Sequence, residues 1–342
     1  MAYNPVALRN TLLSLAAVIL FCLGFMQIAA ITDRSDVIRL HGACIFDDEH
    51  SYTKALVKFS ELVEQYYQGP KQLEFILHKN SELGQEKDFF NYMNIGAVVD
   101  FAIASPSHAS TFSRLVTIMD VPFLFRDTEH YLKTMESGIF GRVEDAVSER
   151  ADVLILGYGG GEKRHLVGRK PIRNLQELEG FYMRVMGSPI QSRMFEAVGA
   201  TPTVISGAEV YNAIQTGVIE GAENSASAIE KYKWFEVADQ VSLAAVSIII
   251  RPLFFNGKRF RKLPVDLQEA IRKAGKEAME FERNYEIAID DPLMEQLVEE
   301  GKVTTHKFEE REQLLELAAP VKRAYASEIG ALDILEAINA IK

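Results

Sequence analysis

The chain has 342 residues, of which 48% are hydrophobic, 25% charged and 10% aromatic. This composition excludes an intrinsically disordered protein, and the length predicts about two domains. The formal net charge of −11 argues against a nucleic-acid partner. An anionic ligand would have to be bound by local cations, because salt screens the overall field beyond about 8 Å.

The first thirty residues are typical of a secretory signal. Arg9 precedes an uncharged apolar run that extends from Leu12 to Ala30, and cleavage is expected near Ala30. The run also approaches the roughly 20 residues that span a bilayer, so an uncleaved inner-membrane anchor stays open as the alternative. The sequence therefore predicts export to the periplasm. Cys44 is then the single cysteine of the mature chain, which excludes an internal disulfide and a cysteine zinc cluster.

Strand and helix patterns alternate beyond the signal, which predicts an α/β fold with a parallel sheet covered on both faces. Strands are expected at 37–43, 73–78, 98–104, 153–158, 182–185 and 203–205, with a long extended segment at 241–255. Helices are expected at 55–66, 87–94, 128–135, 139–148, 189–197, 207–216, from Pro264 until Pro292, and at 309–340. The triplet Gly159-Gly160-Gly161 reads as a flexible loop where the chain crosses between two regions, and Ser206 with Glu209 forms a capping box.

Residues 161–224 contain the side chains for a carboxylate site. Arg164 and Arg184 stand 20 positions apart, and Asn224 follows 40 positions after the second. An arginine presents fixed N–H donors that match a carboxylate in two places, so these three residues suit a small organic acid. The alternative is that the arginines are structural and pair with nearby acids.

Several sequence blocks occur in a characteristic order along the chain. They are Leu83-Gly84, Asp120-Val121-Pro122-Phe123-Leu124-Phe125-Arg126-Asp127, Leu178-Glu179-Gly180-Phe181-Tyr182-Met183-Arg184-Val185, Gly199-Ala200-Thr201-Pro202, Glu209-Val210-Tyr211, Gln215-Thr216-Gly217, Gly221-Ala222-Glu223-Asn224 and Phe235-Glu236-Val237-Ala238. In these blocks the chain resembles the substrate-binding proteins of TRAP (tripartite ATP-independent periplasmic) transporters, DctP type. The resemblance covers nearly all of the chain after the signal.

The resemblance implies a two-lobed periplasmic-binding-protein clamshell with crossing strands and a long helix between the lobes. Lobe I would hold 37–160 plus 250–289, and lobe II 161–249 plus 290–342. The ligand, a small carboxylate, would lie between the lobes, and the TRAP transporter membrane subunits would be the partner. No cofactor and no metal is implied.

The resemblance also assigns roles to individual residues. Arg184 matches the principal carboxylate-binding arginine, Arg164 the second arginine, and Asn224 the amide that contacts the same carboxylate. Asn224 has the alternative role of capping a helix that starts near Ala226.

Two departures from the family pattern concern the size and charge of the ligand. Gly207 stands where many relatives have an aromatic residue, which leaves room for a bulkier ligand. Lys163 either supplies a further cation or points to solvent. Ser105 and Glu49 follow predicted strands, where open α/β sheets place ligands, and are expected at the far end of the ligand.

The sequence contains no nucleophile elbow, HExxH motif, P-loop or dinucleotide fingerprint, so an enzyme is not expected. The function predicted is capture of a small organic acid, such as a dicarboxylate, hydroxy or keto acid or sugar acid, for a TRAP-type transporter. A membrane-anchored solute sensor that uses the same pocket is the alternative.

Overall fold

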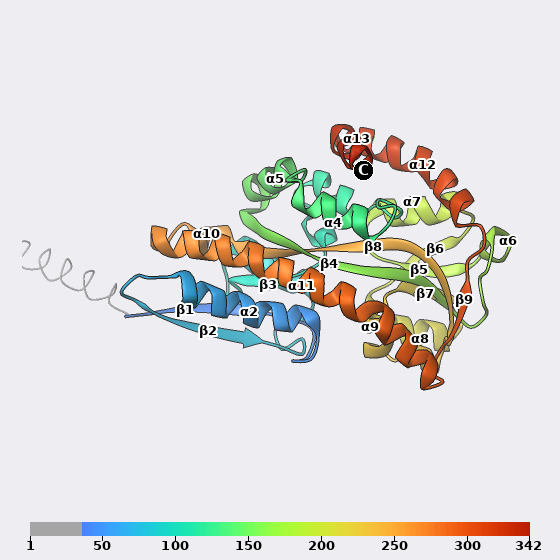
Figure 1. The fold of residues 1–342 in the computed structure, drawn as a ribbon, viewed down its shortest axis with the longest axis horizontal. Coiled ribbons are helices and arrows are strands. Elements are labelled where there is room, and N and C mark those ends of the chain that lie inside the picture. The colour runs from blue at the N-terminus through green and yellow to red at the C-terminus, as the bar shows by residue number, and fades with distance from the viewer. Residues whose placement is uncertain (1–35) are drawn as a thin grey trace, which may run out of the picture. The chain divides into compact units, whose positions relative to one another are not determined.

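The computed structural model describes residues 36–342 (Figure 1), so the predicted signal at 1–30 lies outside the described residues. The described chain divides into two compact units. Residues 36–39 with 69–74 belong to a small unit, and residues 40–68 with 75–342 form a large one. Within the described range, no helix has both the length and the hydropathy needed to cross a membrane.

The described residues form one sheet of nine strands in the order β2-β1-β3-β8-β4-β7-β5-β6, with β9 paired to β8. The β1–β3, β5–β6, β5–β7 and β8–β9 pairs are parallel, whereas β3–β8, β4–β8 and β4–β7 are antiparallel. The expectation of a parallel sheet is therefore wrong, because β4 runs antiparallel to both β7 and β8, and β8 runs antiparallel to β3. The strands are β1 Val37–Ala43, β2 Gln72–His78, β3 Phe101–Ile103, β4 Val153–Gly168, β5 Tyr182–Val185, β6 Thr201–Val204, β7 Gly221–Asn224, β8 Gln240–Asn256 and β9 Thr304–Lys307.

The helices follow the expected order closely, and Ser206 and Glu209 form the predicted capping box. The α-helices are α2 Ser51–Tyr66, α3 Glu86–Ile95, α4 Thr128–Glu136, α5 Gly141–Ala151, α6 Leu175–Leu178, α7 Pro189–Ala197, α8 Val210–Gln215, α9 Ala226–Lys231, α10 Gly257–Phe260, α11 Val265–Glu299, α12 Arg311–Glu328 and α13 Leu332–Ala340. Short 3₁₀ turns are η1 Pro106–Ala109, η2 Arg114–Asp120, η3 Gly207–Glu209 and η4 Trp234–Glu236.

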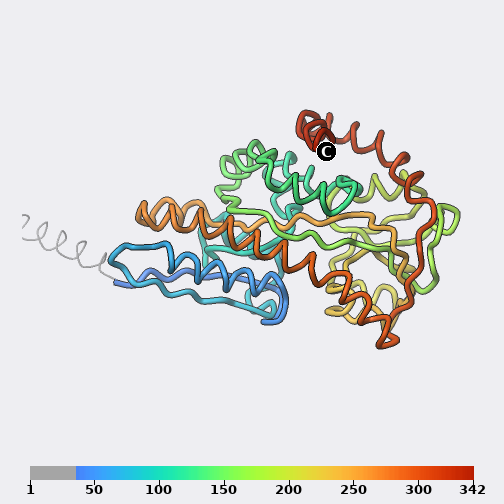
Figure 2. Tube along the Cα trace, in the orientation of Figure 1, coloured from blue at the N-terminus to red at the C-terminus, as the bar shows by residue number. Residues whose placement is uncertain are grey.

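Strand β4 continues through the glycine triplet that was expected to be a loop. Gly160 and Gly161 have φ values of 94° and 109°, and the pairing with β8 shifts register between Gly160 and Lys163. Only glycine adopts such φ values without strain, so the triplet forms a β-bulge that bends the strand and does not end it. In Figure 2, β4 and β8 run side by side across the sheet.

Helix α11 also exceeds its expected length. It spans 35 residues and includes Pro292, where the sequence predicted its end. A proline removes one backbone donor and commonly breaks a helix, but α11 packs along both β4 and α2 (Figure 2). We infer that this tertiary packing outweighs the lost hydrogen bond.

The apolar interior has two described clusters. The larger contains residues of strands β3, β4, β5 and β8 together with helices on both sides, and the second surrounds the fully buried Trp234. The lobe boundaries given above stay a prediction.

Buried carboxylates line the contact between α11 and β4. Glu282, Glu286 and Asp290 recur every fourth residue of the helix and are buried, as is Glu162 on the strand. Glu282 accepts a hydrogen bond from the Gly160 N–H at 2.6 Å, whereas both Glu286 oxygens lack a partner within the described chain. Burial, with the nearby charge of Glu162, raises the pKa of Glu286 to about 8. This contact therefore holds a proton at neutral pH.

The bulge in β4 generates a first prediction. A Cβ at Gly160 would lie 2.4 Å from the Ile249 carbonyl oxygen, so Gly160→Ala combines a steric clash with a disfavoured φ. We expect the free energy of unfolding to fall by about 2 kcal/mol or more, measured by urea denaturation. Gly138→Ala is the matched control, because its φ is 73° but no atom lies within 4 Å. Equal losses in the two variants would contradict the close approach.

The buried carboxylates generate a second prediction. Because the folded pKa of Glu286 lies above the ordinary value of 4.5, the folded state retains a proton that the unfolded state releases, and stability falls as pH rises between them. Glu286→Gln removes this loss. We expect the variant to exceed wild type in unfolding free energy by about 1 kcal/mol or more at pH 8, with the difference shrinking toward pH 5. Glu269→Gln, at an exposed position of α11, should show no such pH-dependent difference.

Candidate functional site

Three adjacent strands bring together the residues expected to bind a carboxylate. Strand β7 lies between β4 and β5, with Arg164 on β4, Arg184 on β5 and Asn224 at the end of β7. Asn224 pairs with His165 across β4–β7. All three predicted residues are buried.

Arg164 is held by a single acid. Its Nε and Nη2 donate to the Glu223 carboxylate, and Nη2 also donates to the Glu223 carbonyl oxygen at 2.7 Å. The exposed fractions of the two side chains are 3% and 1%, so solvent does not weaken the pair. Arg164 thus has its own counter-charge, and its Nη1 alone lacks a hydrogen-bond partner in the described chain.

Arg184 has no acid of its own. Its Nε donates to the Ile205 carbonyl oxygen at 2.8 Å, while its terminal nitrogens make no hydrogen bond or ion pair with the described residues. Burial lowers the pKa of Arg184 to about 10, and the positive charge of Arg164 contributes, against the opposing effect of Glu223. The group stays protonated at neutral pH and presents two free donors.

Asn224 supplies a further donor beside these arginines. Its Oδ1 accepts a hydrogen bond from the Ser225 N–H at 3.1 Å, which orients the amide. The N-cap of α9 is Ser225, so Asn224 does not cap that helix. Its Nδ2 has no partner in the described chain, which suits it to a ligand oxygen.

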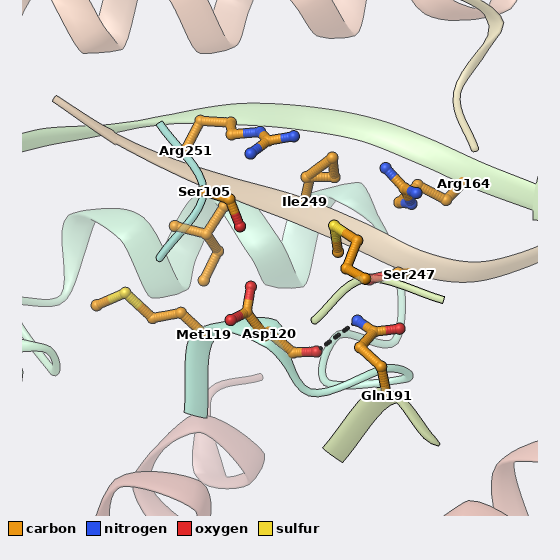
Figure 3. Close-up of a pocket in the computed structure, with 10 residues that line it drawn as sticks. Ser105, Met119, Asp120, Arg164, Gln191, Ser247, Ile249 and Arg251 are labelled. Atoms are coloured by element: carbon orange, nitrogen blue, oxygen red, sulfur yellow. Dashed lines mark hydrogen bonds between the residues drawn. The ribbon is translucent and has the colours of Figure 1, made fainter. Parts of the chain in front are cut away.

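A cavity of about 10 Å³ lies beside Arg164, beneath the two long strands (Figure 3). It has room for about one water molecule, so a larger ligand requires the surrounding elements to move apart. Of the six predicted site residues, Arg164 and Ser105 line it. Its lining consists of Ser105, Met119, Asp120, Arg164, Met186, Gln191, Ser247, Ile249, Ile250 and Arg251.

Arg251 is a site residue that the sequence reading missed. Its Nε donates to the Tyr52 hydroxyl oxygen at 3.1 Å and its Nη1 lies 3.3 Å from a Glu86 carboxylate oxygen. Burial alone would raise the pKa of Glu86, but Arg251 lowers it to about 2. Arg251 interrupts the otherwise apolar 248–255 segment of β8, and a charge at such a position was the available signal.

The space expected at Gly207 is bordered by another aromatic residue. A Cβ at Gly207 would lie 3.6 Å from the Tyr232 hydroxyl oxygen. Burial raises the pKa of Tyr232, and Glu86, Arg251 and Arg184 lie close enough to affect it. We infer that Tyr232 provides the wall that Gly207 lacks.

The remaining predicted residues lie in different surroundings. Ser105 is buried and its Oγ lies 2.8 Å from that of Ser107. The Glu49 side chain is 89% exposed beside Lys54, away from the cavity lining, and its contact with a ligand stays a prediction. Lys163 pairs with Asp291 of α11 at 2.7 Å and does not line the cavity. Its charge is therefore neutralised by this helix, which answers the open question about Lys163.

The chain is similar in sequence to known solute-binding proteins. The family model of bacterial extracellular solute-binding proteins, family 7 (DctP), matches residues 43–328. A solute-binding protein of Sulfitobacter sp. (strain NAS-14.1) is 44% identical over 301 residues, covering 88% of this chain and 91% of its own. The C4-dicarboxylate-binding periplasmic protein DctP of Rhodobacter capsulatus is 26% identical over 296 residues, covering 84% and 85%.

Solved structures agree with the sequence relatives. The crystal structure of a TRAP periplasmic solute-binding protein from Sulfitobacter sp. NAS-14.1, with bound α-D-taluronate, matches with a TM-score of 0.84 and 43% identity. The match covers 88% of this chain and 97% of that one. It confirms the expected α/β binding-protein fold with crossing strands and a long helix.

The Arg164–Glu223 pair generates a third prediction. Glu223→Gln leaves a buried guanidinium without its counter-charge, and we expect it to lower the free energy of unfolding by about 3 to 5 kcal/mol. The control is Glu177→Gln, which removes the more exposed pair with Arg173 and should cost at most about 1 kcal/mol. Urea denaturation of both variants measures the difference. A loss in Glu223→Gln no larger than in the control would show that the buried pair is not structural.

Proposed function

The chain belongs to the bacterial extracellular solute-binding proteins of family 7, and from that premise we propose that it captures a sugar acid by its carboxylate. The protein then delivers this ligand to the membrane subunits of a TRAP transporter. Binding, and not catalysis, is the activity assigned to the pocket.

The observation that carries this proposal is the state of Arg184. Arg184 is buried as a residue, is protonated at neutral pH, and has two terminal nitrogens without a partner among the described residues, an arrangement that favours the binding of an anion. A carboxylate matches the spacing of these planar donors, and the Asn224 amide can donate to the same anion. Arg164 already has Glu223 as its counter-charge. Its proposed role is to raise the local electrostatic potential and to donate a hydrogen bond to the ligand from Nη1.

The class of organic acid is supported by the solved structure described above. That protein is 43% identical and holds α-D-taluronate, a monocarboxylate with several hydroxyl groups. The pocket of this chain adds polar groups suited to such a ligand, including Ser105, Asp120 and Gln191. We therefore propose a hexuronate-type sugar acid in preference to a simple dicarboxylate.

Ligand-driven closure is the proposed mechanism. The cavity of about 10 Å³ is smaller than a sugar acid, so entry requires opening around the crossing strands. A ligand that touches Arg184 on one side and the Arg251 and Ser105 side on the other binds the closed form better and shifts the population toward it. Closure also excludes water and so strengthens each charge-assisted hydrogen bond.

The proposed site of action is the periplasm, reached through the signal at 1–30. The relatives named above are solute-binding and periplasmic binding proteins, which favours transport over the alternative of an anchored sensor. The membrane subunits of the transporter recognise the closed form of the protein.

The fourth prediction tests the carboxylate site directly. Arg184→Ala and Arg184→Lys should each weaken binding of D-galacturonate or D-glucuronate at least about tenfold, or 1.4 kcal/mol, because lysine cannot reproduce the planar pair of donors. Isothermal titration calorimetry measures affinity, and circular dichroism shows that folding is retained. Arg173→Ala, which removes an exposed arginine paired with Glu177, should bind like wild type. Unchanged affinity in both Arg184 variants would exclude the assigned site.

A further inference from the structure

The Asp120 carboxylate is the unexplained acid of the pocket. Asp120 ends η2, and only 6% of the residue is exposed. Its backbone carbonyl oxygen accepts a hydrogen bond from Gln191 Nε2 at 2.8 Å, but its side chain forms no hydrogen bond or ion pair with the described residues. In Figure 3 the carboxylate points toward Ser105, away from its own backbone.

Gln191 presents a second acceptor of the same kind. Its amide nitrogen is used by the Asp120 carbonyl oxygen, and its Oε1 is buried without a donor in the described chain. Buried acceptors without donors cost about 1 to 3 kcal/mol each, and the large majority in folded proteins are satisfied. Both residues line the cavity beside Arg164, so the donors that satisfy them can come from a ligand.

The cations around Asp120 already have acids of their own. Arg251 pairs with Glu86 and Arg164 with Glu223. Arg184 on β5 does not line the cavity, and it has no acid among the described residues. Asp120 has no cation as a partner in the described chain. The site therefore offers an unmatched positive charge at Arg184 for a ligand carboxylate, and the ionised form of Asp120, the acid of the cavity lining, repels a second carboxylate.

We propose that Asp120 and the amide oxygen of Gln191 form the hydroxyl-accepting end of the pocket and select polyhydroxy monocarboxylates over dicarboxylates. This inference rests on the proposed function, since it assumes that Arg184 binds the ligand carboxylate. Sugar hydroxyl groups donate to the two acceptors, whereas the second carboxylate of a dicarboxylate has no proton to donate at neutral pH and meets the charge of Asp120.

The protonation of Asp120 gives this selection a pH dependence. Burial raises the pKa of Asp120 to about 7, against the opposing effect of Arg251, His108 and Arg164. The ionised form is the better acceptor for a hydroxyl, so hexuronate affinity should rise from pH 6 to pH 8, whereas succinate affinity should fall. His108 lies 3.4 Å from Glu86 in the same surroundings, so the Asp120 variant must be measured at both pH values to isolate the effect of Asp120.

The fifth prediction uses Asp120→Asn, which keeps the shape of the side chain. Calorimetric titration with D-galacturonate and with succinate, at pH 6 and pH 8, should show at least a tenfold loss of galacturonate affinity at pH 8. Succinate affinity should stay equal or increase, and the pH dependence of galacturonate binding should flatten. Asp333→Asn on α13 removes the same charge from an exposed acid and should behave like wild type.

The outcomes separate this inference from the proposed function. If wild type binds neither hexuronate nor succinate, the result contradicts both the proposed function and this inference. If wild type binds galacturonate and Asp120→Asn binds it equally well at both pH values, only the role of Asp120 is overturned. If the variant fails to fold, the affinities of the wild-type protein at pH 8 test the inference. Equal affinities for succinate and galacturonate would overturn the proposed selection, and an affinity for succinate at least tenfold weaker would support it.

Discussion

The binding site depends on the antiparallel pairing of two strands, β4 and β8, which together cross the centre of the sheet. Register shifts interrupt this pairing at the glycine triplet and again beside Arg164, so the strands bend without separating. Arg164 and Arg251 are fixed on these two strands, and helix α11 packs along β4. A movement of the strands would therefore displace both cations, which is how the scaffold can couple ligand binding to a change of conformation.

Two arginines of the candidate site are each paired with one acid. Arg164 with Glu223, and Arg251 with Glu86, offset the cost of removing ions from water. Arg184 keeps only a backbone carbonyl oxygen as its partner. An arginine that is desolvated but not neutralised favours the binding of an anion. The pairing of Arg164 and Arg251 with acids is therefore informative, because it leaves Arg184 as the arginine of the site that a ligand anion can neutralise.

The sequence prediction failed where local signals and tertiary packing disagree. A glycine triplet ordinarily indicates a loop, yet here its positive φ values produce bulges inside β4. Pro292 ordinarily ends a helix, but α11 continues to Glu299 while packed on other elements. The alternating pattern predicted a parallel sheet because it could not reveal that β4 runs antiparallel to β7 and β8, and that β8 runs antiparallel to β3.

The sequence alone determined the α/β class and most elements, because periodicity and motif order are local properties, and it singled out Arg164, Arg184 and Asn224, which lie on adjacent strands. Only the tertiary structure decided which arginine is free. Glu223 lies next to Asn224 in the chain, yet its carboxylate neutralises Arg164, 59 positions away. The roles of Arg251, Tyr232 and Asp120 likewise arise from contacts between distant segments, since burial and charge compensation are properties of the folded chain.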